Sequence, residues 1–382
     1  MRCTTAALMV ALVAPVMTSP ARAANDAEVA KLVGRYIEVD TLGGVAVAVY
    51  IDRRTLFFNY GLADSTRTQT VNSDSLFNLA SVGKAFIATL LAQAVKHGEL
   101  ALDDPISKYV KELQGDGDIT KVTLGQLASH TSGLPRVPQE PGHRGLYKLP
   151  DFLRYLSSWK ADKGHEPGKQ DIYSNAGFVL LQLALEKRFD KPAAQLMNER
   201  LLTPLGMSST TLPVPTANAR GQLAPAFKSR AVQGYGPAGR PVGAPGDLQG
   251  AFDWPGTGQL YSSARDMAVF LAANLGALPD QRPLQEAMAF AQHGVFTVSP
   301  RFTQGLAWQR VQNGNVTIVD KNGGLDNTST YIGMIPQARL GIVILMNRGK
   351  QHVTKLGRQI LLDLTGHKGG APSEEGNDGN DL

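Results

Sequence analysis

Apolar residues follow two different periods along the chain and divide it into three regions. Between residues 29 and 37 they recur at helical spacing, which predicts an opening amphipathic helix. Residues 44–51 and 55–62 are rich in β-branched and aromatic side chains and predict a β-hairpin with a short turn. From residue 81 to about 276 the period is mostly 3.6, which indicates a long helical region with loops.

Strand patterns return toward the C-terminus. They cover residues 305–311, 315–320, 328–335 and 341–346, before a last helix at about 353–364. The most economical arrangement is one antiparallel sheet built from both termini, flanked by helices and carrying a helical insertion of about residues 81–300. We therefore predict an α/β chain of the α+β type with one domain at 24–366.

Two segments lack periodicity. Residues 213–256 are rich in Pro, Gly and Ala and predict a long ordered surface loop. Residues 367–382 are polar and Gly-rich and predict a disordered tail.

The first 23 residues have the composition of a secretory signal. Arg2 precedes an apolar run at residues 6–16, and the pattern Ala-Arg-Ala that ends at Ala23 fits a cleavage site. The run is shorter than the ~20 residues that cross a bilayer, and Pro15 interrupts it. We expect cleavage after Ala23, a periplasmic protein and no membrane span in the mature chain.

The charge and the cysteine content of the chain exclude several classes of function. Loss of Arg2 and Arg22 with the signal lowers the formal charge from +5 to +3, without a long basic run, so we expect no nucleic-acid partner. The single cysteine, Cys3, leaves with the signal, which excludes disulfides, a thiolate nucleophile and cysteine-based metal sites in the mature chain. We expect a monomer that acts on small molecules.

Ser81 and Lys84 form the first candidate pair. They lie where an extended segment gives way to a helix, so Ser81 can cap the helix and Lys84 lies on the same face. Burial and the positive helix N-terminus disfavour an ammonium, and a neutral Lys84 can accept the serine proton. The alternative is an ordinary cap beside a surface lysine, since Ser157 and Lys160 have the same spacing.

Tyr173, Ser174 and Asn175 precede the apolar helix that begins near Phe178. A phenol near ammonium groups ionises more easily and can relay a proton. The amide of Asn175 offers a donor and an acceptor to an amide substrate. The alternative is an ordinary turn before a helix.

The third motif is Lys321-Asn322-Gly323-Gly324, between two predicted strands. A cation on an edge strand can bind a substrate carboxylate, and glycines allow close approach of the backbone. The alternative is a Gly-rich hairpin turn with a solvated lysine, because K-x-G also occurs at 96–98 and 355–357.

The order S-x-x-K, Y-x-N, K-x-G resembles class C serine β-lactamases and their relatives among penicillin-binding proteins and family VIII esterases. Between about residues 27 and 365, further segments resemble the family in family order, among them SLFNLASVGKAF, LASHTSGLP, YSNAGFVLLQLALE, LLTPLGMSSTTL and YIGMIPQARLGIVILMNR. The resemblance implies a β-lactamase/transpeptidase-like fold with the active site between the sheet and the helical region.

The resemblance also implies roles for the motif residues. Ser81 would be the acyl-accepting nucleophile, Lys84 its proton partner, and Tyr173 the proton relay in acylation and deacylation. Lys321 would stabilise the ionised Tyr173 and attract the substrate carboxylate. No E-x-x-L-N sequence is present, so deacylation would depend on Tyr173.

Binding of the substrate would use amide groups. Asn175 would hold the substrate amide, and the backbone N–H groups of Ser81 and Gly324 would form the oxyanion hole. Asn322, Gly323 and Gly324 would line the substrate on its other side.

This chain departs from the family pattern at the substrate. Asn322 and Gly324 replace the usual Thr and Ser or Ala of K-T-G-[SA], which predicts a roomier strand and some carbapenem turnover. Val137 occupies the place of an amide-binding glutamine, and Gln139 is displaced from it. In the divergent loop, the aromatic residue that lines the antibiotic would be Phe252 or Trp254.

Three functions therefore remain open. The first is a β-lactamase, the second a D,D-peptidase acting on D-alanyl peptides or a serine esterase, and the third a non-catalytic binder of cell-wall peptides or antibiotics.

We expect no cofactor. The histidines lack metal-ligand spacing, and their simplest interpretation is surface or hydrogen-bonded side chains: His130, His143, His165, His293 and His352. An accessory zinc site of His143, His165 and Asp171, near the Tyr173 loop, is the alternative.

Overall fold

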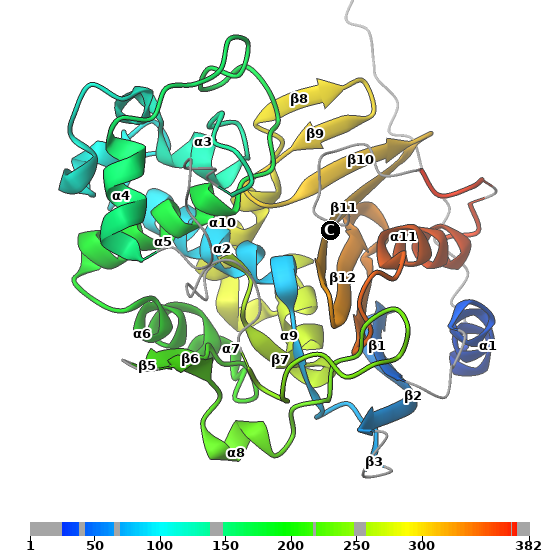
Figure 1. Cartoon of the computed structure of the whole chain (residues 1–382). Helices are drawn as coiled ribbons and strands as arrows, with labels where there is room; N and C mark the ends of the chain where they lie inside the picture. The colour runs from blue at the N-terminus through cyan, green and yellow to red at the C-terminus, as the bar shows by residue number, and fades with distance from the viewer. Residues whose placement is uncertain are drawn as a thin grey trace, which may run out of the picture.

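A mixed sheet-and-helix arrangement is seen in the computed structural model (Figure 1), which describes residues 25–37, 43–64, 69–137, 148–216, 219–247, 257–367 and 369–372. The predicted signal, Gln139, His143, Phe252, Trp254 and most of the predicted tail lie outside these ranges. The domain boundaries at 24 and 366 stay predictions. Among the described helices, none combines the length and the apolar character that a membrane crossing needs.

Within the described residues, nine strands form one antiparallel sheet in the order β3-β2-β1-β13-β12-β11-β10-β9-β8. They are β1 (Gly44–Ile51), β2 (Arg54–Asp64), β3 (Gln69–Thr70), β8 (Phe296–Ser299), β9 (Phe302–Gln304), β10 (Gln309–Asn313), β11 (Val316–Leu325), β12 (Thr328–Ile335) and β13 (Leu340–Met346). The N-terminal hairpin β1–β2 lies beside the C-terminal β13, with Val47 opposite Ile344. The prediction that both termini build one sheet is therefore confirmed.

Two late strands differ from the prediction. The segment 305–308 is not a strand, since Ala307 has a φ of 63°, a left-handed conformation that a strand cannot contain. β11 continues five residues beyond the predicted end at Asp320, so Lys321 to Gly324 lie inside a strand and not after it.

Helices cover both faces of the sheet (Figure 1). On one face lie α1 (Asp26–Tyr36) and α11 (Val353–Leu364), which share an apolar core with Val47 and Ile344. On the other face lies the helical region, whose core includes Val319 and Leu345. Because side chains alternate along a strand, neighbouring residues of β11 belong to different faces.

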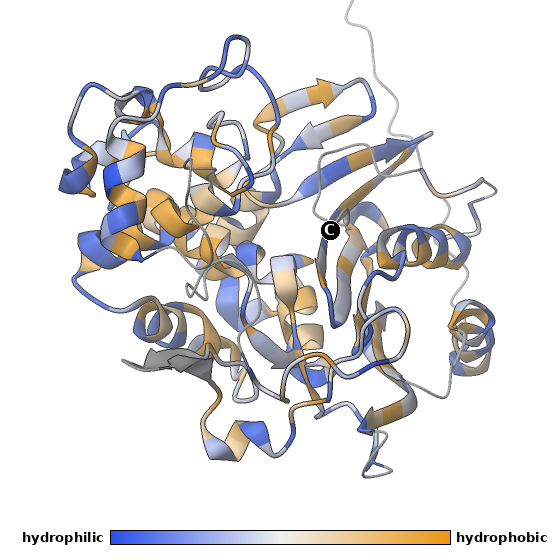
Figure 2. Cartoon of the chain, viewed as in Figure 1, coloured by the Kyte–Doolittle hydropathy of each residue, from blue (hydrophilic) through white to orange (hydrophobic). Residues whose placement is uncertain are grey.

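The helical region lies where the sequence predicted it, although β8, within the predicted range of 81–300, already belongs to the sheet. Its α-helices are α2 (Lys84–Lys96), α3 (Leu124–Ala128), α4 (Leu149–Ser157), α5 (Asn175–Phe189), α6 (Ala193–Met197), α7 (Thr203–Leu205), α9 (Ala264–Asn274) and α10 (Arg282–Gln292). Figure 2 shows that α5 is apolar over most of its length, and its residues 176–185 are buried. α5 therefore forms the centre of this region.

The segment 213–256 contains more regular structure than predicted. It includes β5 (Val214–Thr216), β6 (Ala219–Gln222) and the short helix α8 (Pro225–Lys228). After it, β7 (Tyr261–Ser263) pairs with β4 (Leu76–Asn78), the strand that leads to Ser81.

Candidate active site

Ser81 lies in a 3₁₀ turn, η1 (Ala80–Gly83), between β4 and α2. Ala80 has a φ of 46°, a left-handed conformation that costs an L-residue roughly 1 kcal/mol. Gly258 packs against this turn so closely that a Cβ there would lie 2.4 Å from the carbonyl oxygen of Ala80. The predicted helix cap is wrong, because α2 begins only at Lys84 and its N-cap residue is Gly83.

The hydroxyl of Ser81 contacts Lys84 instead. The Nζ of Lys84 donates to Ser81 Oγ at 3.2 Å and also to the carbonyl oxygen of Thr257. Residues three apart eclipse each other in a 3₁₀ turn, which explains the contact. At the second S-x-x-K match, Ser157 donates to the Arg154 carbonyl and Lys160 to the Asp116 carbonyl, so those two do not pair.

Tyr173 completes the cluster around Ser81. Its hydroxyl donates to Ser81 Oγ at 2.5 Å. Three basic side chains surround its ring: the Nζ atoms of Lys84 and Lys321 each lie 5.1 Å from the ring centroid, and Arg136 Cζ lies 5.3 Å from it. The Tyr173 hydroxyl thus contacts the serine while its ring packs against these three basic side chains.

Lys84 is fully buried, and burial lowers its pKa below the ordinary lysine range. The contact with Tyr173 raises the pKa, whereas the charges of Lys321 and Arg136 lower it further. The net shift favours a neutral amine that can accept a proton from Ser81.

β11 brings the third motif to the serine. β10 pairs with β11 only as far as Asp320, opposite Gln309, whereas β12 continues beside Lys321 to Leu325. The prediction that Lys321 lies on an edge strand is right only for the second half of β11, which has no β10 partner and borders η1. The first half of β11 lies between β10 and β12. A Cβ on Gly323 would lie 2.8 Å from the backbone nitrogen of Ser81, so the close approach requires glycine.

The expectation that the Asn322 side chain lines the substrate is wrong. Asn322 alternates with Lys321 along β11 and faces α11, on the far side of the sheet. Its side chain is buried, and its Nδ2 donates to Thr354 Oγ1 at 2.9 Å. Any contact from this position to a substrate therefore comes from the backbone.

Asn175 is the first residue of α5 and is partly exposed. Its N–H donates to the carbonyl oxygen of Arg136, and the adjacent Ser174 caps α5 by accepting from the N–H of Gly177. The role of Asn175 at a substrate amide stays a prediction. Val137 packs against the core, so no side-chain amide stands at that position.

Two residues near Tyr173 were missed as site residues by the sequence reasoning. Arg136 is one of the three basic side chains around its ring, and His130 is a buried side chain whose ring centroid lies 4.4 Å from that of Tyr173. The sequence did contain one signal for them: residues 129–135 are mostly small and polar with a Gly and a Pro, a composition typical of a tight loop. His293 and His352 are exposed, as the simplest interpretation expects.

An open pocket of about 560 Å³ adjoins Tyr173 and is lined by Arg136, Tyr155 and Trp159 among others. His165 and Asp171 also line it, but the third predicted zinc ligand, His143, lies outside the described residues. Within the described part of the chain, no three His, Cys, Asp or Glu side chains gather as a metal site would need. The accessory zinc site stays a prediction.

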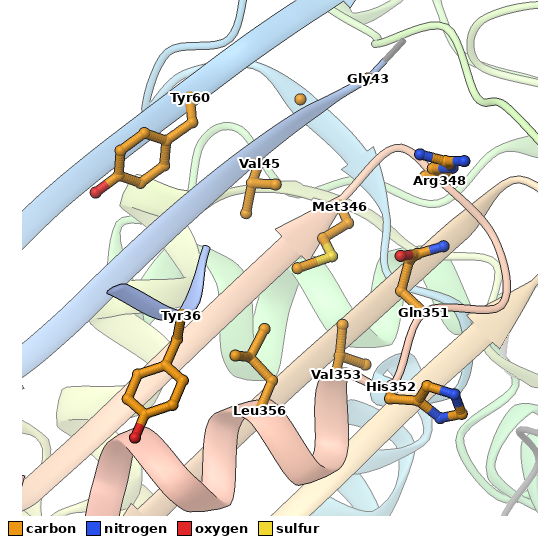
Figure 3. Close-up of a pocket in the computed structure, with 11 residues that line it drawn as sticks. Tyr36, Gly43, Val45, Tyr60, Met346, Arg348, Gln351, His352, Val353 and Leu356 are labelled. Atoms are coloured by element: carbon orange, nitrogen blue, oxygen red, sulfur yellow. The ribbon is translucent and has the colours of Figure 1, made fainter. Parts of the chain in front are cut away.

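A separate pocket of about 290 Å³ lies on the opposite face of the sheet, beside α1 and α11. Figure 3 shows Tyr36, Val45, Met346 and Leu356 along its wall. The Tyr36 hydroxyl already donates to Asp363 at 2.6 Å, and neither serine nor lysine lines the pocket. This pocket therefore shares no residue with the cluster around Ser81.

Comparison with known proteins agrees with this geometry. The profile of the family described as "Beta-lactamase" matches residues 29–365. A β-lactamase of Lysobacter lactamgenus is 30% identical over 364 residues, covering 86% of this chain and 88% of the relative. The D-alanyl-D-alanine-carboxypeptidase/endopeptidase AmpH of Escherichia coli K12 is 28% identical, covering 85% and 86%.

A solved structure has the same fold. The D-alanine carboxypeptidase AmpC from Burkholderia cenocepacia superposes with a TM-score of 0.75 at 28% identity, over 89% of this chain and all of that chain. The fold and the serine-lysine-tyrosine cluster define a serine hydrolase of the penicillin-recognising type. The chain belongs to the β-lactamase family, which confirms the predicted family and fold class.

Proposed function

We propose that this chain is a serine β-lactamase of the class C type, which hydrolyses the β-lactam amide through an acyl-enzyme on Ser81. The observation that carries the proposal is the pair of contacts on the Ser81 hydroxyl, from Tyr173 at 2.5 Å and from Lys84 at 3.2 Å. A hydroxyl held by an amine of lowered pKa and by a phenol has the proton acceptor and the proton donor that acyl transfer requires.

In acylation, the neutral amine of Lys84 accepts the Ser81 proton while Oγ attacks the β-lactam carbonyl carbon. The backbone N–H groups of Ser81 and Gly324 stabilise the oxyanion, an effect worth several kcal/mol in acyl transfer. When the carbonyl carbon–nitrogen bond breaks, Tyr173 delivers a proton to the leaving nitrogen and regains one from Lys84. Lys321 attracts the substrate carboxylate beside Tyr173.

In deacylation, a water molecule attacks the ester carbonyl carbon and gives its proton to Tyr173, which passes its own phenolic proton to the neutral amine of Lys84. The ester bond breaks, Ser81 Oγ takes a proton back, and the opened β-lactam leaves as a carboxylic acid. No glutamate of an E-x-x-L-N sequence is available for this step, so Tyr173 carries it. The active enzyme is a monomer without a cofactor, and residues 1–23 direct it to the periplasm.

A D,D-peptidase acting on D-alanyl peptides is the second candidate, because AmpH and the Burkholderia structure bear carboxypeptidase names. Ser81, Lys84 and Tyr173 serve both reactions, and the rate of deacylation separates them. A peptidase holds a penicillin as a long-lived ester, whereas a β-lactamase releases it.

Intact-mass measurement with penicillin tests the proposal. The purified mature chain should return to its free mass within the mixing time while opened penicillin accumulates. A persistent adduct of one penicillin per chain would favour the peptidase. No adduct and no product, with several β-lactams and activated esters, would favour a non-catalytic binder.

A further inference from the structure

His130 holds the backbone on both sides of Tyr173. Its carbonyl oxygen accepts the N–H of Ile172 at 2.7 Å, and its Nδ1 accepts the N–H of Ser174 at 3.2 Å. One residue therefore fixes the two peptide groups that flank the tyrosine.

The imidazole also packs against the phenol ring. The two ring centroids lie 4.4 Å apart with a 32° angle between the planes, and Phe178 lies on another side of the imidazole at 5.1 Å. His130 is 1% exposed, so this contact is sheltered from water. A tilted aromatic contact of this kind fixes the plane of the Tyr173 ring and the direction of its hydroxyl.

The contact with Ser174 requires a neutral imidazole. Nδ1 accepts a hydrogen bond, so the proton of the neutral ring is assigned to Nε2. Burial lowers the pKa of His130 well below the ordinary histidine range, and the charges of Lys321, Lys84 and Arg136 lower it further. Protonation of Nδ1 would place two N–H donors against each other.

We infer that His130 is a positioning residue for Tyr173: its Nδ1 and its ring together place the Tyr173 hydroxyl on Ser81 Oγ. This inference rests on the proposed function, in which Tyr173 moves protons to and from Ser81. A phenol displaced by about 1 Å would cost roughly 10²-fold in rate. His130 touches neither the serine nor the reacting atoms and acts through Tyr173.

Two substitutions separate the two contributions of His130. His130→Asn keeps an acceptor at the position of Nδ1 and loses the ring. His130→Phe keeps the ring and loses the acceptor. His130 has a φ of 59°, a left-handed conformation that asparagine also tolerates, so His130→Asn is the variant with the least added strain.

The experiment compares wild type, His130→Asn and His130→Phe by stopped-flow acylation with a slowly deacylated β-lactam. We expect His130→Phe to lower the acylation rate constant by roughly 10²-fold and His130→Asn to recover a large part of it. Affinity for the unreacted β-lactam, measured in a Ser81→Ala background, should stay unchanged in both variants. If the His130→Phe protein does not fold, His130→Gln takes its place. The glutamine amide lies one bond further from the backbone than the asparagine amide and therefore misses the position of Nδ1.

The experiment distinguishes failure of the inference about His130 from failure of the proposed function. Wild-type acylation rates in His130→Phe or, in its place, His130→Gln would overturn the inference. A loss of β-lactam affinity equal to the loss of rate would also overturn it, because the residue would then only support the pocket. Failure of the wild type to acylate at all would contradict the proposed function instead.

Discussion

The hydroxyl of Tyr173 lies 2.5 Å from Oγ of Ser81, although 92 residues separate the two in sequence. The turn η1 presents the serine, and the segment just before α5 presents the tyrosine from the helical region. Lys321 reaches the same ring from the sheet. The candidate site thus lies where the sheet and the helical region meet, as the family resemblance implies.

Replacement of Tyr173 by phenylalanine tests the proton relay. Tyr173→Phe keeps the ring contact with His130 and removes the hydroxyl, so we expect a loss of roughly 10²- to 10⁴-fold in kcat, the usual size of general acid–base catalysis. Steady-state hydrolysis of a chromogenic cephalosporin measures it. Activity within a few-fold of wild type would contradict the relay, provided that the thermal unfolding temperature is unchanged.

The depressed pKa of Lys84 makes stability depend on pH. Its pKa is lower in the folded than in the unfolded chain, so between those two values the unfolded state binds more protons. Relative to Lys84→Met, the free energy of unfolding of wild type should therefore rise with pH across this interval. The same contribution is lost as the pH falls through the pKa of Lys84 in the folded chain. Urea unfolding of both proteins at several pH values measures the difference. If the difference in free energy of unfolding between wild type and Lys84→Met does not change with pH, the pKa of Lys84 is not depressed in the folded chain.

A buried ion pair supports the strand behind Lys321. Arg358 on α11 contacts Asp320 through Nε at 2.6 Å and Nη2 at 3.2 Å, and both side chains are buried. Arg358→Met leaves the carboxylate without this partner, and we expect it to lower the free energy of unfolding by about 3–5 kcal/mol.

The matched control for this pair lies at the surface. Arg54 contacts Asp26 at 3.0 Å with both side chains exposed, and we expect Arg54→Met to cost less than about 1 kcal/mol. Equal losses in Arg358→Met and Arg54→Met, measured by urea unfolding, would show that the buried pair has no special role.

The sequence predicted which residues gather at the site better than it predicted the backbone around them. Ser81, Lys84, Tyr173 and Lys321 could be found because their spacing and order carry the signal. The predicted strand ended at Asp320. Had it been predicted to continue, alternation would have placed the Asn322 side chain on the same face of the sheet as Ile318 and Asp320.

Other features depend on tertiary contacts that no local pattern contains. Ala80 has a left-handed conformation and packs closely against Gly258, which is remote in sequence. His130 becomes part of the site only because the loop that follows α3 pairs with residues 172–174 through His130 itself. The end of the β10–β11 pairing at Asp320 likewise follows from where β10 begins.

Position 324 tests the prediction on carbapenems. Gly324 replaces the usual Ser or Ala next to the proposed oxyanion hole, so we expect slow imipenem turnover by wild type and a several-fold decrease in Gly324→Ser. The matched control is Asn322→Thr, whose side chain faces Thr354 on α11, and we expect it to change imipenem turnover less. A permanent imipenem adduct in wild type, or equal rates in wild type and Gly324→Ser, would contradict this account of the strand.

The proposed function requires Ser81 to be the nucleophile of a β-lactam hydrolase. Steady-state hydrolysis of a chromogenic cephalosporin is compared between wild type and Ser81→Ala, with thermal unfolding as the control for folding. We predict measurable turnover by wild type and none above the uncatalysed rate by a folded Ser81→Ala protein. Turnover retained by Ser81→Ala would contradict the assignment of the nucleophile.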